Sequence, residues 1–375
     1  MTLRRAVVAP DKFKGSLTAL EAAAAIERGL RAGAPSIEEI RVIPMADGGE
    51  GTVDAFLAGG AKRIVRFVRG PLGNRVEAAF ALEGTTAIVE MSAASGLALI
   101  PAERRDPLRT TTFGTGGLVR AALDAGASHI VVGIGGSGTN DGGAGFLQAL
   151  GARLLDASGE ALPPGGAALV RLAQIDLREF DGRVRSANVE VAADVDNPLC
   201  GPNGASAIFG PQKGASAQDV RLLDGALAHF ADVAAQALGV DRRAEPGAGA
   251  AGGLGFALIA FTGATLRPGV DIVAQLRGLE PALIGADAAF TGEGSIDRQT
   301  LAGKTVAGVA RLAKAAGVRS IVAFGGRVDP QAGEAFETLG VTCVAIAPPD
   351  EPVADAMRNA ATNLERAARR LAGLL

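Results

Sequence analysis

Aromatic residues other than phenylalanine are missing from this 375-residue chain, which contains no Trp, no Tyr and 14 Phe. Basic and acidic residues nearly balance, with 37 Lys and Arg against 40 Asp and Glu, and neither sign forms a long block. Proteins that bind nucleic acids present basic stripes or grooves, and those that bind single strands add aromatic stacking platforms. The composition therefore argues against a nucleic-acid-binding protein.

Cysteine and histidine are scarce as well. Cys200 and Cys343 have no partners at metal-ligand spacing, so we expect free thiols in a reducing cytoplasm. His129 is expected at the start of a strand and His229 within a helix, and both positions favour structural roles. Because neither histidine is a good catalytic candidate and no G-x-S-x-G segment is present, a Ser–His–Asp hydrolase is disfavoured and a general base must be a carboxylate.

Long hydrophobic runs are absent, and no apolar segment reaches the length that spans a bilayer. The apolar stretch after Arg4 and Arg5 is too short for a signal peptide and ends at Pro10 and Asp11. We therefore expect a cytoplasmic protein without membrane contact. No internal repeat is found.

Glycine is abundant instead, with 53 residues, about twice the average share. Its most prominent cluster, residues 133–145, follows the β-branched strand candidate at 129–132 and leads into a helix candidate at 144–150. Glycine lets a backbone approach an anion closely, and the N–H groups of such a turn and of the helix N-terminus can point at the charge. The segment therefore predicts a phosphate-binding loop.

The same glycines also fit a dinucleotide-binding turn. Residues 133–138 satisfy G-x-G-x-x-G, and Asp156 lies about as far downstream as a ribose contact would. Asp141, however, stands near the helix start, where it would repel a pyrophosphate unless a cation lay between them. This favours a metal–phosphate site, and a tight turn without any ligand stays open as a third interpretation.

The chain length and the rhythm of its elements predict two domains, since 375 residues exceed what one domain usually holds. Strand–loop–helix units are expected at both ends of the chain, with short antiparallel strands between 62 and 91. We therefore predict an α/β fold with a discontinuous first domain, residues 1–70 plus 285–375. A second α/β domain, residues 71–284, is inserted and carries the glycine-rich phosphate loop.

Four further loops share the form of an apolar strand followed by a polar, glycine-containing or acidic segment. They are residues 11–16, 47–52, 194–197 and 291–297. Because parallel strands end at one edge of a sheet and ligands bind there, we expect all five loops to converge, for instance across an interdomain cleft. Their cations and carboxylates fit phosphoryl transfer, which needs charge neutralisation, a metal ligand and a base for the attacking hydroxyl.

These loops closely resemble the type I glycerate kinase family, in the family's order and along the whole chain. The similar stretches are residues 9–17, 44–52, 70–74, 110–116, 133–145, 193–201 and 291–304. The resemblance implies two α/β domains around a cleft, the first Rossmann- or flavodoxin-like. It also implies ATP- and Mg²⁺-dependent phosphorylation of D-glycerate, typically to 2-phosphoglycerate. Lys12 stands where Ser is common in the family, and Gly138 where Ala is common.

The loops and the resemblance together give an expected site. Asp194 is the predicted base that accepts the substrate hydroxyl proton, because it ends a strand beside Asp196 and Asn197. Lys14 and Asp47 are expected to act with it. The residues expected to contact the nucleotide are Gly135, Gly136, Ser137, Thr139, Asn140, Asp141 and Glu293. Those expected to face glycerate are Lys12, Ser16, Thr110, Thr111 and Thr112, and the expected metal ligands are Asp141 and Asp196.

Three alternatives stay open at this stage. An NAD-dependent dehydrogenase of a small hydroxy acid would bind its cofactor at residues 133–138. A kinase of another small hydroxy acid would share the chemistry, and a nucleotide sensor would bind ATP without turnover. The expected ligands are small molecules, and a homodimer is left open.

Overall fold

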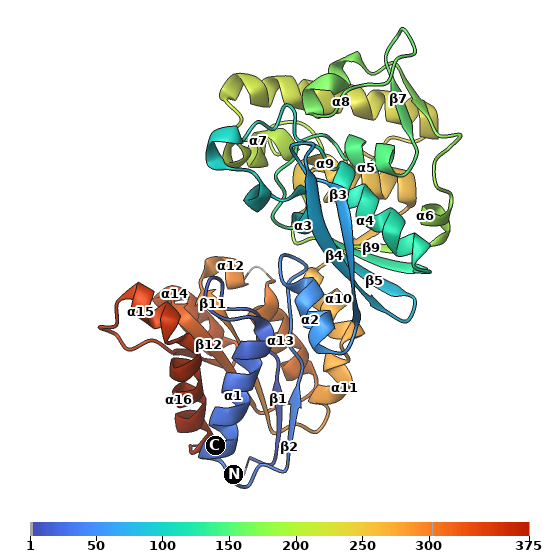
Figure 1. Ribbon diagram of the computed structural model, residues 1–375. Helices are drawn as coiled ribbons and strands as arrows, with labels where there is room; N and C mark the ends of the chain where they lie inside the picture. Colours follow the sequence, from blue (N-terminus) through green and yellow to red (C-terminus); the bar gives the residue numbers. More distant parts are fainter. Residues whose placement is uncertain (1–2, 302, 375) are drawn as a thin grey trace. The chain divides into compact units, whose positions relative to one another are not determined.

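The computed structural model describes residues 3–301 and 303–374. Met1, Thr2, Ala302 and Leu375, which the predicted first domain includes, lie outside the described residues. Contacts divide the chain into two units (Figure 1). Unit 1 is Met1–Asp47, Asp54–Gly60 and Pro268–Leu375, and unit 2 is Gly48–Val53 and Ala61–Arg267.

Unit 1 is built on a five-stranded parallel sheet, as the apolar strand candidates at both chain ends predict. Its order is β13–β12–β11–β1–β2. Numbered within the unit this is 2-1-3-4-5, the flavodoxin-like order, whose ligand crevice lies at the carboxyl ends of the first and third strands. The strands are β1 (Arg5–Val8), β2 (Glu39–Val42), β11 (Ala288–Ile296), β12 (Ser320–Val328) and β13 (Val341–Ala345). The predicted α/β class is confirmed, and the crevice lies at the ends of β1 and β11.

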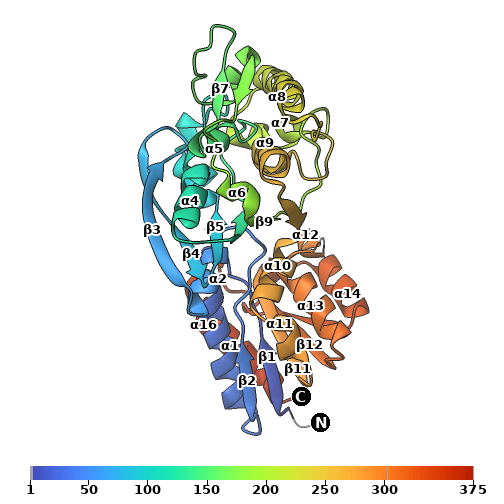
Figure 2. The same cartoon turned by 90° about the vertical axis from the view of Figure 1, so that its right-hand side faces the viewer.

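Helices cover both faces of this sheet (Figure 2). On one face α1 (Ala19–Gly33) packs along α16 (Ala360–Ala372), and on the other lie α10 (Gly269–Leu276), α11 (Leu279–Leu283) and α13 (Thr305–Ala315). A Thr at position 18 with a Glu three residues later predicts a capping box, and the structure confirms it, because Thr18 and Glu21 each accept the other's backbone N–H. The remaining helices are α2 (Thr52–Ala58), whose first two residues belong to unit 2, α12 (Arg298–Leu301), α14 (Pro330–Thr338) and α15 (Val353–Arg358).

Unit 2 contains a six-stranded mixed sheet in the order β10–β9–β6–β5–β4–β3. The antiparallel strands predicted between 62 and 91 form its β3–β4–β5 meander, and β5, β6, β9 and β10 are parallel. The strands are β3 (Lys62–Arg69), β4 (Arg75–Glu83), β5 (Thr86–Glu90), β6 (His129–Gly133), β9 (Asn188–Ala192) and β10 (Thr265–Arg267), with β7 (Arg153–Leu155) and β8 (Gln174–Asp176) forming a separate pair. The glycine-rich loop and Asp194 therefore follow neighbouring parallel strands at one sheet edge.

The helices of unit 2 enclose one large apolar core around this sheet. Phe230 and Phe256 meet edge to face in it, with ring centroids 5.5 Å apart. The helices are α3 (Ser92–Ser95), α4 (Phe113–Asp124), α5 (Ala144–Ala149), α6 (Arg183–Ser186), α7 (Ala205–Phe209), α8 (Ala217–Leu238) and α9 (Ala250–Ala257). Helix α8 has the predicted bounds. Among the described residues, no helix combines the length and apolar character needed to cross a membrane.

Three expectations about local structure are wrong. The predicted loop at 291–297 is mostly strand, because β11 continues to Ile296 by pairing with β12. The sequence from 352 to 371 predicts one closing helix, but the structure divides it at Asn359 into α15 and α16. The glycine- and alanine-rich residues 248–255 predict a linker, but they contain a left-handed turn inside α9, in which Ala251, Gly252 and Gly253 have positive φ.

The units differ in their bounds from the predicted domains, and the domain assignment itself stays a prediction. Residues 62–69, placed in the first domain, form β3 of the six-stranded sheet. Residues 268–284, placed in the second, belong to unit 1 and include α10 and α11. In both cases the sequence pattern predicts the local element but does not show which of the two units that element packs against.

Gly29 offers a test of the α1–α16 contact. A Cβ at this position would lie 2.3 Å from the backbone oxygen of Glu365, so Gly29→Ala should lower the free energy of unfolding by about 1–3 kcal/mol. Gly225 of α8 is the matched control, because a Cβ there meets nothing within 4 Å. Gly225→Ala should raise stability by up to about 1 kcal/mol through helix propensity. Urea unfolding measures both, and equal effects would contradict the close contact.

Candidate functional site

The glycine-rich loop after β6 presents an exposed backbone at the sheet edge. Gly135 and Gly136 are exposed, and their N–H groups have no acceptor among the described residues. The rest of the loop is tied down, since Gly138 N–H donates to the Ser95 oxygen at 2.9 Å and Leu97 N–H to the Gly136 oxygen at 2.9 Å. A fixed turn with outward N–H groups fits a phosphate.

Asp141 holds the loop to two helices from inside. Its side chain is 0% exposed and accepts the N–H groups of Thr112 at 2.8 Å, Gly143 at 3.1 Å and Gly145 at 3.2 Å. Thr112 precedes α4 and Gly143 precedes α5, so one carboxylate lies at the positive ends of both helices. Burial raises the pKa of Asp141, and the hydrogen bonds from Thr112, Gly145 and Gly143 oppose that rise.

This arrangement bears on two sequence-based expectations. Both oxygens of Asp141 accept hydrogen bonds inside the protein, and its role as a metal ligand stays a prediction. The N-terminus of α5 was expected to point at a phosphate, but its first N–H groups donate to Asp141 and to the Thr112 hydroxyl instead. Only the exposed turn at Gly135 and Gly136 keeps the expected anion-binding character.

The three threonines predicted to face glycerate also hold the loop. Thr110, Thr111 and Thr112 are at most 1% exposed. The Thr110 hydroxyl donates to the Gly138 oxygen at 3.0 Å, the Thr111 hydroxyl accepts Phe113 N–H at 3.2 Å, and the Thr112 hydroxyl bonds to Asp141. Their side chains make internal hydrogen bonds, and their predicted contacts with the substrate stay predictions.

A second brace comes from residues 204–214. Ser206 accepts a hydrogen bond from the Asn140 amide at 2.8 Å, and Lys213 Nζ donates to the Thr139 backbone oxygen at 2.7 Å. Thr139 Oγ1 and Asn140 Oδ1 are buried without a hydrogen-bond partner among the described residues. Of these, the Thr139 hydroxyl can donate to an anion, whereas the amide oxygen cannot.

Lys213 was missed by the sequence reasoning. It is 1% exposed, and burial lowers its pKa to about 7, with the charge of Asp141 acting in the opposite direction. One signal could have found it, because Lys213 is the only charged residue between 204 and 214. A single charged residue in a loop of small residues is a candidate site residue when the chain also contains phosphate-binding loop motifs.

Asp194 and Asp196 follow β9 and are exposed. Ala192, the last residue of β9, pairs with Gly133, the last residue of β6, so Asp194 and the glycine-rich loop start from adjacent points of the same edge. Asn197 donates from its amide to the Asn203 oxygen at 2.8 Å. The predicted roles of Asp194 as base and Asp196 as metal ligand stay predictions.

Unit 1 carries a group of carboxylates at its own sheet crevice. Asp11 follows β1 and is 7% exposed, and it accepts bonds from the Thr305 hydroxyl and from Lys12 N–H at 2.7 Å. Burial, then the charge of Asp47, raises its pKa to about 7, while the two hydrogen bonds oppose the rise. The pKa of Asp11 therefore lies near neutral pH, where its carboxyl can accept and release a proton.

Glu293 belongs to the same group and lies on β11. Burial raises its pKa, the Thr300 hydroxyl and Lys304 oppose the rise, and the charges of Asp47 and Asp297 add to it. The charges of Asp47 and Glu293 raise the pKa of Asp11, and the charge of Asp47 raises that of Glu293, so the structure brings these three predicted loops together within unit 1. The sequence reasoning placed Asp47 and Glu293 in the site but gave Asp11 no role.

The other predicted residues of unit 1 lie on the loop that starts at Asp11. Lys14 is exposed, Lys12 is half-buried, and the Ser16 hydroxyl donates to the Phe13 oxygen at 3.0 Å. Their predicted contacts with substrate stay predictions. Within residues 3–301 and 303–374, no three His, Cys, Asp or Glu side chains are placed to share a metal ion.

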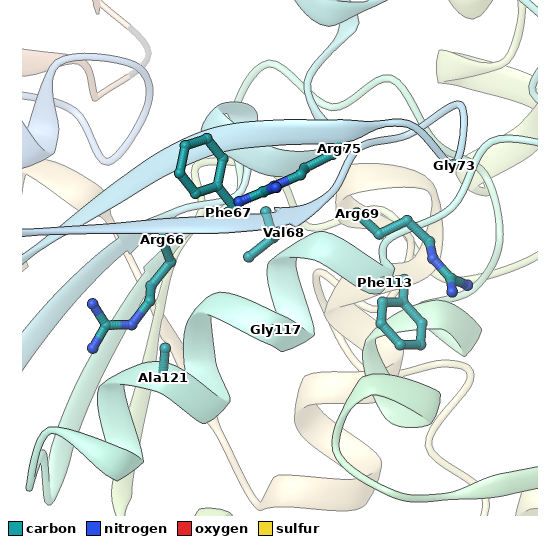
Figure 3. A pocket seen from close by; sticks show the side chains of 9 residues that line it. All are labelled: Arg66, Phe67, Val68, Arg69, Gly73, Arg75, Phe113, Gly117 and Ala121. Carbon is teal, nitrogen blue, oxygen red and sulfur yellow. The ribbon is translucent and has the colours of Figure 1, made fainter.

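A groove of about 410 Å³ lies on unit 2, along β3 and α4 (Figure 3). Arg69 stacks on Phe113 at 4.4 Å and Arg75 on Phe67 at 4.0 Å. None of the residues predicted for the site lines it. Because β3 is an edge strand, its basic side chains oppose pairing with a strand of another molecule, which accounts for them without a ligand. The lining residues are Arg66, Phe67, Val68, Arg69, Gly73, Arg75, Phe113, Gly117 and Ala121.

Comparisons with known proteins agree along the full chain. A model of the glycerate kinase family matches residues 6–375. A glycerate kinase of Bacillus subtilis (strain 168) is 50% identical over 369 residues, covering 98% of this chain and 96% of the relative. Glycerate 2-kinase of Escherichia coli (strain K12) is 47% identical over 377 residues, covering 98% and 97%.

A solved structure shows the same fold. The crystal structure of a protein described as glycerate kinase 2 from Salmonella typhimurium LT2 matches with a TM-score of 0.87 at 45% identity, covering 100% of this chain and 98% of that one. The comparisons give no support to the dehydrogenase alternative. Asp156, the ribose contact of that alternative, instead accepts hydrogen bonds from Ser158 and Glu160 in a turn.

The buried charge of Asp11 predicts a pH-dependent stability. A carboxyl with a folded pKa of about 7 against an ordinary 3.8 contributes fully below the lower value and loses stability as the pH rises through the higher one. Asp11→Asn keeps an acceptor for Thr305 and Lys12, so its Tm should exceed that of wild type by an amount that grows between about pH 4 and 7. Calorimetry across this range tests it, and a pH-independent difference would contradict the buried titration.

Asp141→Asn tests the double helix cap. The amide NH₂ would face backbone donors that now meet an oxygen, so the free energy of unfolding should fall by about 2–4 kcal/mol. Asp329 is the matched control, because it caps α14 alone through the N–H groups of Gln331 and Ala332, and Asn is nearly as good as Asp at such a cap. A loss in Asp141→Asn no larger than in Asp329→Asn would refute the special role of Asp141.

Proposed function

Because the chain belongs to the glycerate kinase family, we propose that it transfers the γ-phosphoryl group of ATP to the 2-hydroxyl of D-glycerate, giving 2-phosphoglycerate and ADP. The observation that carries this proposal is the full-length match to relatives named glycerate kinase and glycerate 2-kinase at 47–50% identity. Each unit taken by itself has features that suit this reaction: unit 2 has a turn with free N–H donors, and unit 1 has carboxylates with raised pKa values.

The nucleotide phosphates are proposed to bind at residues 135–140. The free N–H groups of Gly135 and Gly136 supply donors, and the Thr139 hydroxyl is a further donor without a present partner. Such donors act by fixed position, since the loop is already held by Asp141 and Lys213. Positioning and charge neutralisation are what phosphoryl transfer asks of a protein.

The glycerate hydroxyl must lose its proton as its oxygen bonds to the γ-phosphorus and the bond to ADP breaks. Asp194 is proposed as the acceptor of that proton, from its place at the end of β9. One observation favours Asp11 as the second candidate: its buried carboxyl has a pKa of about 7, which suits proton transfer near neutral pH. Lys14 and Lys12 are proposed to neutralise the substrate carboxylate or the transferring group.

Mg²⁺ would neutralise charge on the nucleotide phosphates. Magnesium sites of this kind use one or two protein carboxylates together with substrate phosphates, so the lack of a three-residue cluster among the described residues is compatible with it. Asp196 is proposed as its protein ligand because it is exposed at the edge where the phosphate loop begins, whereas Asp141 is fully engaged.

Product identification tests the proposed reaction. Incubation with D-glycerate, ATP and Mg²⁺ should release ADP in a coupled assay, and phosphorus NMR should show 2-phosphoglycerate. L-glycerate and glycolate are the matched substrates for specificity. A 3-phosphoglycerate signal would overturn the 2-hydroxyl assignment, and ADP release only with another hydroxy acid would overturn the substrate.

Asp194→Asn and Asp11→Asn separate the two candidate bases. Loss of the base should lower kcat about 100-fold or more, with binding of ATP little changed. We expect this loss in Asp194→Asn, and a loss below about tenfold in Asp11→Asn. The opposite result would transfer the role to Asp11, in which case the wild-type kcat should also fall as the pH drops below about 7.

A further inference from the structure

Lys213 is buried in a way that lysines seldom are. Its side chain is 1% exposed, and fully buried lysines are rare in proteins unless they are paired. Burial lowers its pKa, a sign that the surroundings disfavour the charged ammonium group. A Met of similar length would fill the same space without that cost, so packing alone does not account for the amine.

The amine of Lys213 is directed at a backbone oxygen of the glycine-rich loop. Nζ donates to the Thr139 oxygen at 2.7 Å. Asp141 influences Lys213 through its charge, but the hydrogen bonds that the Asp141 carboxylate accepts come from Thr112, Gly143 and Gly145. The hydrogen bond of the lysine is therefore made to the loop itself.

The chain around Lys213 fixes the position of its amine. Lys213 ends a 3-10 turn at residues 211–213, in which its N–H donates to the Gly210 oxygen at 3.0 Å, and the Ala215 N–H just after the turn donates to the same oxygen at 3.1 Å. Ser206, from the same stretch, accepts the Asn140 amide at 2.8 Å. The segment at residues 204–214 thus contacts two consecutive loop residues. It binds the backbone oxygen of Thr139 and the side-chain amide of Asn140.

The far side of the Thr139 oxygen is closed by Gly252. A Cβ on Gly252 would lie 2.0 Å from that oxygen, and Gly142 N–H donates to the Gly252 oxygen at 3.0 Å. The Thr139 carbonyl is therefore confined between the Lys213 amine and the left-handed turn of α9. Without the amine, a buried carbonyl would lose its donor, and the peptide between Thr139 and Asn140 would be free to reorient.

We propose that Lys213 is a positioning residue for the phosphate-binding loop, holding the Thr139 carbonyl so that Gly135 and Gly136 keep their N–H groups toward the nucleotide. This inference rests on the proposed nucleotide role of that loop. Lys213 does not touch the substrates; it acts through the loop backbone. It accounts for a buried amine that would otherwise only reduce the stability of the unit.

Lys213→Met tests the proposal, with exposed Lys314 of α13 as the matched control through Lys314→Met. The first variant should raise the Kd and the KM for Mg·ATP about tenfold, while the KM for D-glycerate stays within about twofold. Lys213→Arg, which retains an N–H donor, should recover part of the ATP affinity. The control should match wild type in every measurement.

Gly252→Ala provides an independent route to the same defect. Its Cβ would displace the Thr139 oxygen with Lys213 intact, so ATP affinity should fall here too. Two results would overturn the proposal: ATP affinity of Lys213→Met within twofold of wild type, or a lower Tm together with equal losses for both substrates. Direct titration with Mg·ATP keeps the test separate from the reaction, because it is read even if D-glycerate proves not to be the acceptor.

Discussion

The buried carboxylate of Asp141 is the constraint on which the nucleotide side of this protein depends. Three backbone N–H groups from two helix starts converge on it, so the positive ends of two helices stabilise its charge. The glycine-rich loop leaves β6 and must pass this point to enter α5, so its inner half is fixed. Its outer half, at Gly135 and Gly136, is thereby held with free donors facing outward.

Three buried ionisable groups lie at the candidate sites. Asp141 and Lys213 lie on the inner side of the glycine-rich loop, and Asp11 lies at the crevice of the flavodoxin-like sheet. Burial shifts the pKa of each group in the direction that favours its neutral form. Each such group lowers stability unless hydrogen bonds compensate. The protein compensates Asp141 most fully and Asp11 less, which fits a structural part for the first and proton exchange for the second.

Much of the architecture could be predicted because local signals and packing agree. The capping box of α1, the bounds of α8 and the alternation of strands and helices are local, and a family resemblance carried by several loops was confirmed. The sequence is less informative where partners distant along the chain decide. Nothing in the neighbourhood of Asp141 and Thr112 shows that they bind each other across 29 positions. Strand β11 continues through its glycines because β12 pairs with it. The burial of Asp11 and Lys213 depends on segments that are distant in sequence.

The most direct test of this account is hydrogen–deuterium exchange of the peptide spanning residues 133–142, with and without saturating Mg·ATP. Gly135 and Gly136 are exposed, and their N–H groups have no acceptor among the described residues, so they should exchange fast in the free protein. If the nucleotide phosphates bind at this loop, these amides should exchange more slowly with Mg·ATP, and their exchange should be unchanged with D-glycerate alone. Unchanged exchange in this peptide at saturating Mg·ATP, with protection elsewhere, would contradict the assignment of the nucleotide phosphates to this loop.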